Sequence, residues 1–219
     1  MLNRYDLACF DMDGTLTKAR SSWIWVHDYL GTSNEEGYKR FVNQEITEEE
    51  FMREDIGIWR SVKPDLSKRD IIHMFQSIPL INGIQETVAT LHECGIRCVI
   101  ISGGIDICCT MLANEFGFDD FAADELITDN EGHLTGEGVK VVDLADKGHW
   151  VKVMMEKYGT TPERTIAIGN SFSDVSMFNI AGLSIAFNPT DPWTSEAADH
   201  TVKSETISDI LDCILHPEE

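Results

Sequence analysis

Residues 8–17 read ACFDMDGTLT, an apolar run that ends at two aspartates one residue apart. Such a run predicts a buried strand of a parallel α/β sheet, with Asp11 and Asp13 at its carboxyl end. Residues two apart in extended backbone point the same way, so both carboxylates face one crevice. Ligands of open α/β sheets bind at this edge. This stretch therefore predicts the fold class and the place of the site together.

The two carboxylates have a definite chemistry. Their mutual repulsion is commonly relieved by a divalent cation, and hard cations such as Mg²⁺ prefer oxygen ligands. A carboxylate in this position can attack phosphorus and form an aspartyl-phosphate, while its neighbour handles the proton of the leaving group. For an isolated match, the alternative is a solvated Asp-x-Asp-Gly turn that caps a helix.

The rest of the chain alternates between two kinds of pattern. Apolar and β-branched runs predict strands at residues 7–10, 98–101, 121–123, 165–168 and 184–187, with helical patterns between most of them. This alternation predicts a doubly wound parallel α/β sheet. A turn signal at residues 129–132 predicts a short hairpin within residues 126–142.

Two further positions carry polar groups suited to phosphate. Ser102 ends the run 98–101, and its hydroxyl with the amides of Gly103 and Gly104 can donate to a phosphate oxygen. The alternative for Ser102 is a helix N-cap, which is itself compatible with an anion. Lys147 starts a predicted helix, where a lysine opposes the helix dipole, so a task in neutralising phosphate and Asp11 is favoured. Taken alone, it would be a surface lysine.

Four motifs in order resemble those of the haloacid dehalogenase superfamily of phosphohydrolases. They are residues 11–15 (DMDGT), 100–104 (IISGG), Lys147 in ADKG, and 168–174 (IGNSFSD). The resemblance runs nearly end to end and is closest to the phosphoserine phosphatase branch. It implies a Rossmann-like core from residues 1–15 and 81–219, with a small helical cap at residues 16–80 inserted after the first strand. It also implies Mg²⁺-dependent hydrolysis of a small-molecule phosphomonoester through an aspartyl-phosphate.

The resemblance implies a role for each motif residue. Asp11 is the expected nucleophile, and Asp13 is the expected general acid and base. The expected phosphate-binding residues are Ser102, Gly103 and Lys147, and the expected Mg²⁺ ligands are Asp11, Asp13, Asn170 and Asp174.

The fourth motif departs from the family pattern. Asn170 stands where relatives usually carry an aspartate that ligates Mg²⁺. An amide oxygen can ligate a hard cation but adds no charge, so we expect weaker metal affinity unless Asp174 supports the ligand set. Ser173 also replaces a common asparagine. These departures leave two alternatives open: a phosphotransferase of the same chemistry, and a degenerate non-catalytic module for phosphate binding or interaction.

The cap positions that would choose the leaving group depart as well. In the phosphoserine phosphatase branch, a glutamate and an arginine recognise the amino acid part of the substrate. An ungapped alignment places Arg20 and Asp55 there, with both charges reversed. Either the two residues swap roles on a zwitterionic substrate, or the substrate has no ammonium group, or Arg20 and Asp55 are merely a surface pair.

Composition limits the classes of partner. A chain of 219 residues with 42% hydrophobic content can bury one core and a small subdomain, and its net charge of −21 argues against nucleic acid. No apolar stretch approaches a membrane span, and residues 1–6 lead into the first strand without a signal peptide, so we expect a cytoplasmic protein with no membrane partner. The six cysteines fit no common zinc pattern and are expected as reduced thiols.

Overall fold

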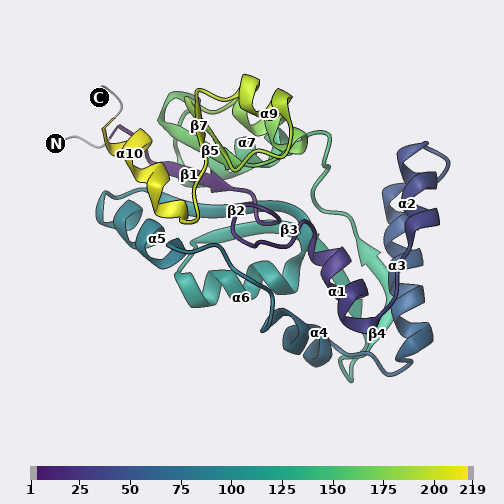
Figure 1. The fold of residues 1–219 in the computed structure, drawn as a ribbon. Coiled ribbons are helices and arrows are strands. Elements are labelled where there is room, and N and C mark those ends of the chain that lie inside the picture. Colours follow the sequence, from purple (N-terminus) through teal and green to yellow (C-terminus); the bar gives the residue numbers. More distant parts are fainter. Residues whose placement is uncertain (1–3, 217–219) are drawn as a thin grey trace.

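A computed structural model describes residues 4–216, which are built around a seven-stranded sheet in the order β4-β3-β2-β1-β5-β6-β7 (Figure 1). Only the β3–β4 pair is antiparallel among these described residues, and every other pair is parallel. The predicted doubly wound α/β sheet is therefore confirmed. The strands are β1 Leu7–Phe10, β2 Arg97–Ile105, β3 Asp120–Thr128, β4 Leu134–Val139, β5 Thr165–Gly169, β6 Leu183–Phe187 and β7 His200–Val202.

Helices cover both faces of the sheet and form a group beside it (Figure 1). The α-helices are α1 Ser22–Leu30, α2 Glu35–Val42, α3 Glu48–Val62, α4 Lys68–Phe75, α5 Ile84–Glu93, α6 Asp106–Phe116, α7 Gly148–Tyr158, α8 Val175–Phe178, α9 Pro192–Ala197 and α10 Ile210–Leu215. Short 3₁₀ turns lie at η1 Pro162–Arg164, η2 Phe172–Asp174 and η3 Ile207–Asp209. Within residues 4–216, no helix is both long and apolar enough to cross a membrane.

The central strand β1 is fully buried, and its side chains alternate between two apolar clusters. Ala8 and Phe10 pack with the cluster that includes residues of α5, α6 and α10, whereas Leu7 and Cys9 pack with residues of α7 and α8. A strand covered on both faces reads as a continuous apolar run, which is why residues 7–10 were predictable as β1.

The parallel register brings three strand ends to one edge of the sheet. Phe10 lies level with Ile100 of β2 and Ile168 of β5. The backbone amide of Asp11 then donates to the Ile168 carbonyl oxygen at 2.9 Å. The polar residues that follow these three strands therefore meet at the edge where a ligand of an α/β sheet is expected.

Strand β2 continues past the point where the sequence pattern predicts its end. Ser102 lies inside β2, and α6 begins only at Asp106 with Ile105 as its N-cap. The helix N-cap interpretation of Ser102 is therefore wrong. Between the pairs Ile101–Ala122 and Ile105–Asp124 the register shifts, so β2 bulges where its two glycines lie.

The helical insert, residues 22–75, contains α1 to α4 and lies to one side of the sheet together with β4 (Figure 1). Ser21 caps α1, and Thr47 with Glu50 forms a capping box at the start of α3. Helix α3 packs on β4, with an ion pair of 2.9 Å between Arg53 and Glu137. The expected division into a core at 1–15 and 81–219 and a cap at 16–80 stays a prediction.

The hairpin of β3 and β4 and the short strand β7 lie at the two ends of the sheet. The predicted hairpin is confirmed, because β3 and β4 pair around a turn in which Gly132 has a φ of +87°. The sequence pattern does not predict strand β7, because it is only three residues long, two of them polar, at the edge of the sheet. The six cysteines are all free thiols in the described structure, as expected.

The close contact between α7 and α8 gives a test of this packing. A Cβ at Gly148 would lie 2.5 Å from the Ser176 carbonyl oxygen, whereas a Cβ at Gly57 in α3 would meet nothing within 4 Å. We expect Gly148→Ala to lower the free energy of unfolding by about 1–3 kcal/mol. The control Gly57→Ala should raise it by up to about 1 kcal/mol. Urea unfolding measures both, and an unchanged stability of Gly148→Ala would contradict the packing.

Candidate active site

A buried lysine joins two aspartates at the edge formed by β1 and β5. The Lys147 ammonium donates to Asp11 Oδ1 at 2.6 Å and to Asp174 Oδ1 at 2.7 Å. Lys147 is 1% exposed, so the surface interpretation of this residue is wrong. Burial works against its charged form, but the two carboxylates outweigh burial and hold the pKa of Lys147 above its usual range. Lysine therefore acts here as a fixed positive charge.

Burial and neighbouring charges shift the pKa of Asp11 in opposite directions. Burial raises the pKa of the Asp11 carboxyl to about 7, the Asp174 charge adds to this, and the Lys147 ammonium opposes it. Asp11 Oδ2 lies beside the Thr15 hydroxyl at 3.5 Å. With Asp13 nearby, the cluster holds more carboxylates than cationic side chains, and an added cation would relieve the excess.

Asp174 lies behind Lys147 rather than in the open crevice. Its Oδ2 accepts the backbone amides of Asn170 at 2.9 Å and Ser171 at 3.0 Å, and its side chain is fully buried. Both oxygens are thus occupied by protein donors. In this structure Asp174 therefore contacts Lys147 and the loop after β5 and leaves no carboxylate oxygen without a protein donor.

Asp13 is oriented by the first residue of α1. Its Oδ2 accepts the backbone amide of Ser22 at 2.9 Å and the Ser22 hydroxyl at 3.0 Å, and the same hydroxyl accepts the Ile105 amide at 2.9 Å. Within the described residues, Asp13 Oδ1 is buried without a hydrogen-bond partner. Burial raises the pKa of Asp13 to about 6, against the two hydrogen bonds from Ser22. Asp13 thus presents one free oxygen with a raised proton affinity.

The orientation of the Asn170 side-chain amide decides whether the site can accept a metal ion. The end of its amide that faces Asp11 Oδ2 and the Asp13 carbonyl oxygen lies 3.2 Å from each. With nitrogen in that position the amide donates to both oxygens; with oxygen there, three oxygens converge without a proton between them. The second orientation is a hard-cation site, so the residues fit Mg²⁺. Across residues 4–216 no three His, Cys, Asp or Glu side chains form a metal-binding group, so the carbonyl and amide oxygens are needed.

Ser102 and Gly103 lie beside this cluster on β2. The Ser102 oxygen accepts the Gly104 amide at 3.0 Å, which leaves its hydroxyl proton available to a ligand. Gly104 has no room for a side chain, because a Cβ would lie 2.7 Å from Asp13 Oδ2. The Gly103 carbonyl oxygen accepts the Trp23 indole N–H at 3.1 Å, which joins this strand to α1.

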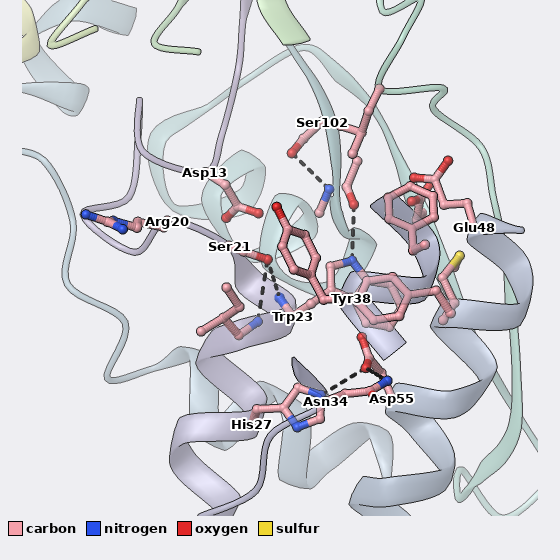
Figure 2. Close-up of a pocket in the computed structure, with 18 of the residues that line it drawn as sticks. Asp13, Arg20, Ser21, Trp23, His27, Asn34, Tyr38, Glu48, Asp55 and Ser102 are labelled. Carbon is pink, nitrogen blue, oxygen red and sulfur yellow. Dashed lines mark hydrogen bonds and ion pairs between the residues drawn. The ribbon is translucent and has the colours of Figure 1, made fainter. Parts of the chain in front are cut away.

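The cluster forms one end of a pocket of about 790 Å³ between the sheet edge and the helical insert. Figure 2 shows Asp13 and Ser102 toward one end of the pocket and His27, Asn34 and Asp55 toward the other. A volume of this size suits a small molecule. The structure thus brings the motif residues together; they are Asp11, Asp13, Ser102, Gly103, Lys147, Asn170 and Asp174.

The two residues from the cap alignment, Arg20 and Asp55, both line this pocket but do not form an ion pair with each other. Asp55 is 3% exposed and contacts Asn34 and His27, so the interpretation of a surface pair is wrong for it. Arg20 is exposed and lies beside Asp13 (Figure 2).

The sequence pattern missed several residues of the site. Ser22 orients Asp13, and its only signal is its place beside the N-cap Ser21 at the start of a helical pattern. His27 and Asn34 hold Asp55 from α1 and from the turn before α2, and no spacing in the sequence indicates that contact.

Comparison with known proteins agrees with this geometry. The haloacid dehalogenase-like hydrolase family matches residues 8–179, which is more than half of the chain. The chain is 28% identical over 219 residues to the phosphoserine phosphatase of Archaeoglobus fulgidus, which covers 97% of this chain and 61% of that protein. It therefore spans about three fifths of the length of that relative.

A second relative and a solved structure have nearly the same length as this chain. The phosphoserine phosphatase of Methanocaldococcus jannaschii is 28% identical over 218 residues, covering 96% of this chain and 98% of that protein. A phosphoserine phosphatase structure with an analogue of the phospho-aspartyl intermediate superposes with a TM-score of 0.79 at 27% identity, covering 97% of this chain and all of that one. With its four motifs gathered at one sheet edge, this chain belongs to the haloacid dehalogenase-like hydrolase family and is similar to its phosphoserine phosphatases.

Proposed function

We propose that the protein is a Mg²⁺-dependent phosphatase that hydrolyses a small-molecule phosphomonoester through an aspartyl-phosphate on Asp11. The observation that carries the proposal is the placement of Asp11 on Lys147 beside the unpartnered oxygen of Asp13. This gives a nucleophile, a fixed cation and a proton carrier at one end of a pocket of small-molecule size.

The phosphate is bound by groups that point into the same end of the pocket. The Ser102 hydroxyl and the amide of Gly103 donate to its oxygens, and the Lys147 ammonium neutralises negative charge as the transition state forms. Because Lys147 is held by Asp11 and Asp174, its charge needs no reorganisation during the reaction.

In the first step, an Asp11 carboxylate oxygen attacks phosphorus in line with the ester oxygen. The bond between phosphorus and the nucleophilic oxygen forms as the bond to the ester oxygen breaks, and Asp13 gives its proton to the departing alkoxide. Ser22 keeps Asp13 aimed at that oxygen through two hydrogen bonds.

In the second step, water attacks the aspartyl-phosphate. Asp13, now ionised, takes a proton from the water, and the bond between phosphorus and Asp11 breaks to release inorganic phosphate. The raised proton affinity of Asp13 suits it to both steps, since it must donate and accept in one cycle.

Asp11, the Asp13 carbonyl oxygen and Asn170 would hold Mg²⁺, with Asp174 behind them. When bound, Mg²⁺ supplies positive charge that offsets the carboxylates and the phosphate. The relatives support the phosphatase chemistry, because they are phosphoserine phosphatases and one solved structure contains a phospho-aspartyl analogue. We assign residues 16–80 as the cap that excludes water from the pocket.

The two remaining alternatives differ from hydrolysis in what happens to the phosphoryl group. A phosphotransferase would use a second alcohol in place of water, and a non-catalytic module would bind phosphate without turnover. The intact set of Asp11, Asp13, Ser102 and Lys147 in one cluster favours turnover over a module.

Removing the nucleophile tests the chemistry. We expect wild-type protein with Mg²⁺ to release phosphate from a panel of phosphoserine, phosphoglycolate, sugar phosphates and an aryl phosphate. Asp11→Asn should lose at least about a thousandfold in kcat, because an amide cannot form the acyl-phosphate. The matched control Asp212→Asn, which changes an exposed acid on α10 away from the pocket, should keep its activity on the aryl phosphate. Turnover that survives in Asp11→Asn would refute the mechanism.

The charge of residue 170 tests the metal site. We expect Asn170→Asp to tighten Mg²⁺ binding by about tenfold, or about 1.4 kcal/mol, because it adds a negative charge beside the ligand oxygens. Isothermal calorimetry measures the affinity, and Asn179→Asp adds the same charge at an exposed position as control. Equal or weaker binding by Asn170→Asp would remove residue 170 from the ligand set.

A further inference from the structure

The end of the pocket away from Asp11 is built from aromatic rings on three helices. Trp23 of α1 stacks on the buried Trp59 at 5.4 Å between ring centroids. Phe41 of α2 stacks on Phe51 of α3 at 5.4 Å, and Tyr38 lies 6.3 Å from Phe51. Trp23, Tyr38, Phe41 and Phe51 all line the pocket. The leaving group of a substrate whose phosphate lies at Asp11 therefore meets the faces and edges of these rings.

A buried carboxylate lines the same pocket as these rings. Asp55 is 3% exposed, and its Oδ1 accepts the Asn34 amide at 2.8 Å and lies 3.1 Å from His27 Nε2. His27 is fixed in turn by a contact of 2.8 Å between its Nδ1 and the Thr32 hydroxyl. The described residues give Asp55 Oδ2 no hydrogen-bond donor, although the residue lines the pocket. Asp55 is thus a rigid carboxylate with one oxygen left for a ligand.

The charges around this end are negative. Asp28, Glu35 and Glu48 line the pocket with Asp55, and Glu48 is paired with Lys140 at 2.8 Å. The lysine and arginine side chains that line the pocket are Lys147, which is held by two aspartates, and Arg20. Figure 2 shows Arg20 beside Asp13 with its guanidinium directed away from Asp55.

From this arrangement we propose that the leaving group of the substrate carries an ammonium group and no carboxylate, so that the substrate is the phosphomonoester of an amino alcohol. The inference rests on the proposed phosphatase function and names its substrate class. Aromatic faces and a desolvated carboxylate together bind a cation. A substrate carboxylate at this end would instead meet the Asp55 carboxylate, and no lysine or arginine of the pocket lining is directed toward it.

An amino acid substrate fits this end less well. Its ammonium and carboxylate are bonded to the same carbon atom, so the groups that bind them must converge there. Asp55 and Arg20 lie toward opposite ends of the pocket (Figure 2). A purely apolar leaving group also fits less well, because it would bring no hydrogen-bond donor to the remaining oxygen of Asp55.

Matched substrates test the proposal directly. We would measure kcat/KM with Mg²⁺ for phosphoethanolamine, its hydroxyl analogue ethylene glycol monophosphate, its carboxylate analogue phosphoglycolate, and phosphoserine. p-Nitrophenyl phosphate reports the phosphatase chemistry alone. The kcat/KM for phosphoethanolamine should be at least about tenfold higher than that for the hydroxyl analogue or the carboxylate analogue. The kcat/KM for phosphoserine should not exceed that for phosphoethanolamine.

Two variants test whether Asp55 and Tyr38 cause the preference for phosphoethanolamine. Asp55→Asn keeps an oxygen for Asn34 but removes the charge, so it should lower the preference for phosphoethanolamine over its hydroxyl analogue by about tenfold. Asp65→Asn, an exposed acid of the helical insert that does not line the pocket, is the matched control and should keep the preference. If Asp55→Asn fails to fold, the exposed Tyr38→Leu should lower the same preference, because it removes one ring from the cation site.

The outcomes separate the two proposals. No turnover of any substrate, p-nitrophenyl phosphate included, overturns the phosphatase function and this inference with it. Turnover of p-nitrophenyl phosphate with phosphoglycolate or phosphoserine preferred over phosphoethanolamine overturns the inference alone. A preference for phosphoethanolamine that survives in both Asp55→Asn and Tyr38→Leu also overturns it.

Discussion

The site depends on one interaction, the buried contact of Lys147 with Asp11 and Asp174. A lysine that is 1% exposed is tolerated only with its charge compensated, and removing one partner of such a pair is strongly destabilising. The contact therefore holds together the end of β1, the start of α7 and the loop after β5. Once these segments are fixed, the Asn170 amide, the Asp13 carbonyl and Asp11 Oδ2 converge on one point. Asp11, Asp13 and Asp174 together carry more negative charge than Lys147 neutralises, and a divalent cation would offset this excess.

A second link joins the helical insert to this edge. The Ser22 hydroxyl contacts both Asp13 Oδ2 and the Ile105 amide, so the first turn of α1, the end of β2 and the candidate acid are coupled. Farther along, α1 carries Trp23 and His27, and α3 carries Asp55. The orientation of α1 thus determines the position of the Asp13 carboxylate and the shape of the pocket at the leaving-group end. A movement of α1 would change the two together, so substrate choice and proton transfer are structurally connected.

The sequence predicts the sheet and the motif cluster well for physical reasons. Strands buried on both faces appear as continuous apolar runs, and the parallel register places whatever follows them at one edge. Asp11, Ser102, Lys147 and Asn170 could be found in this way. The end of β2 could not, because glycines permit both a turn and the observed bulge. The contacts of Asp55 with His27 and Asn34 could not be predicted either. They join α3, α1 and the turn before α2, and no sequence periodicity relates these segments.

The proposed mechanism requires a carboxylate oxygen of Asp11 to bond to phosphorus, and trapping the intermediate tests this most directly. Protein quenched during turnover would be reduced with borohydride, which converts an aspartyl-phosphate to homoserine, and the modified residue would be located by mass spectrometry of its peptides. We predict homoserine at position 11 only when Mg²⁺ and substrate are both present. Modification at Asp13 or Asp174, or active turnover without any modified aspartate, would contradict it.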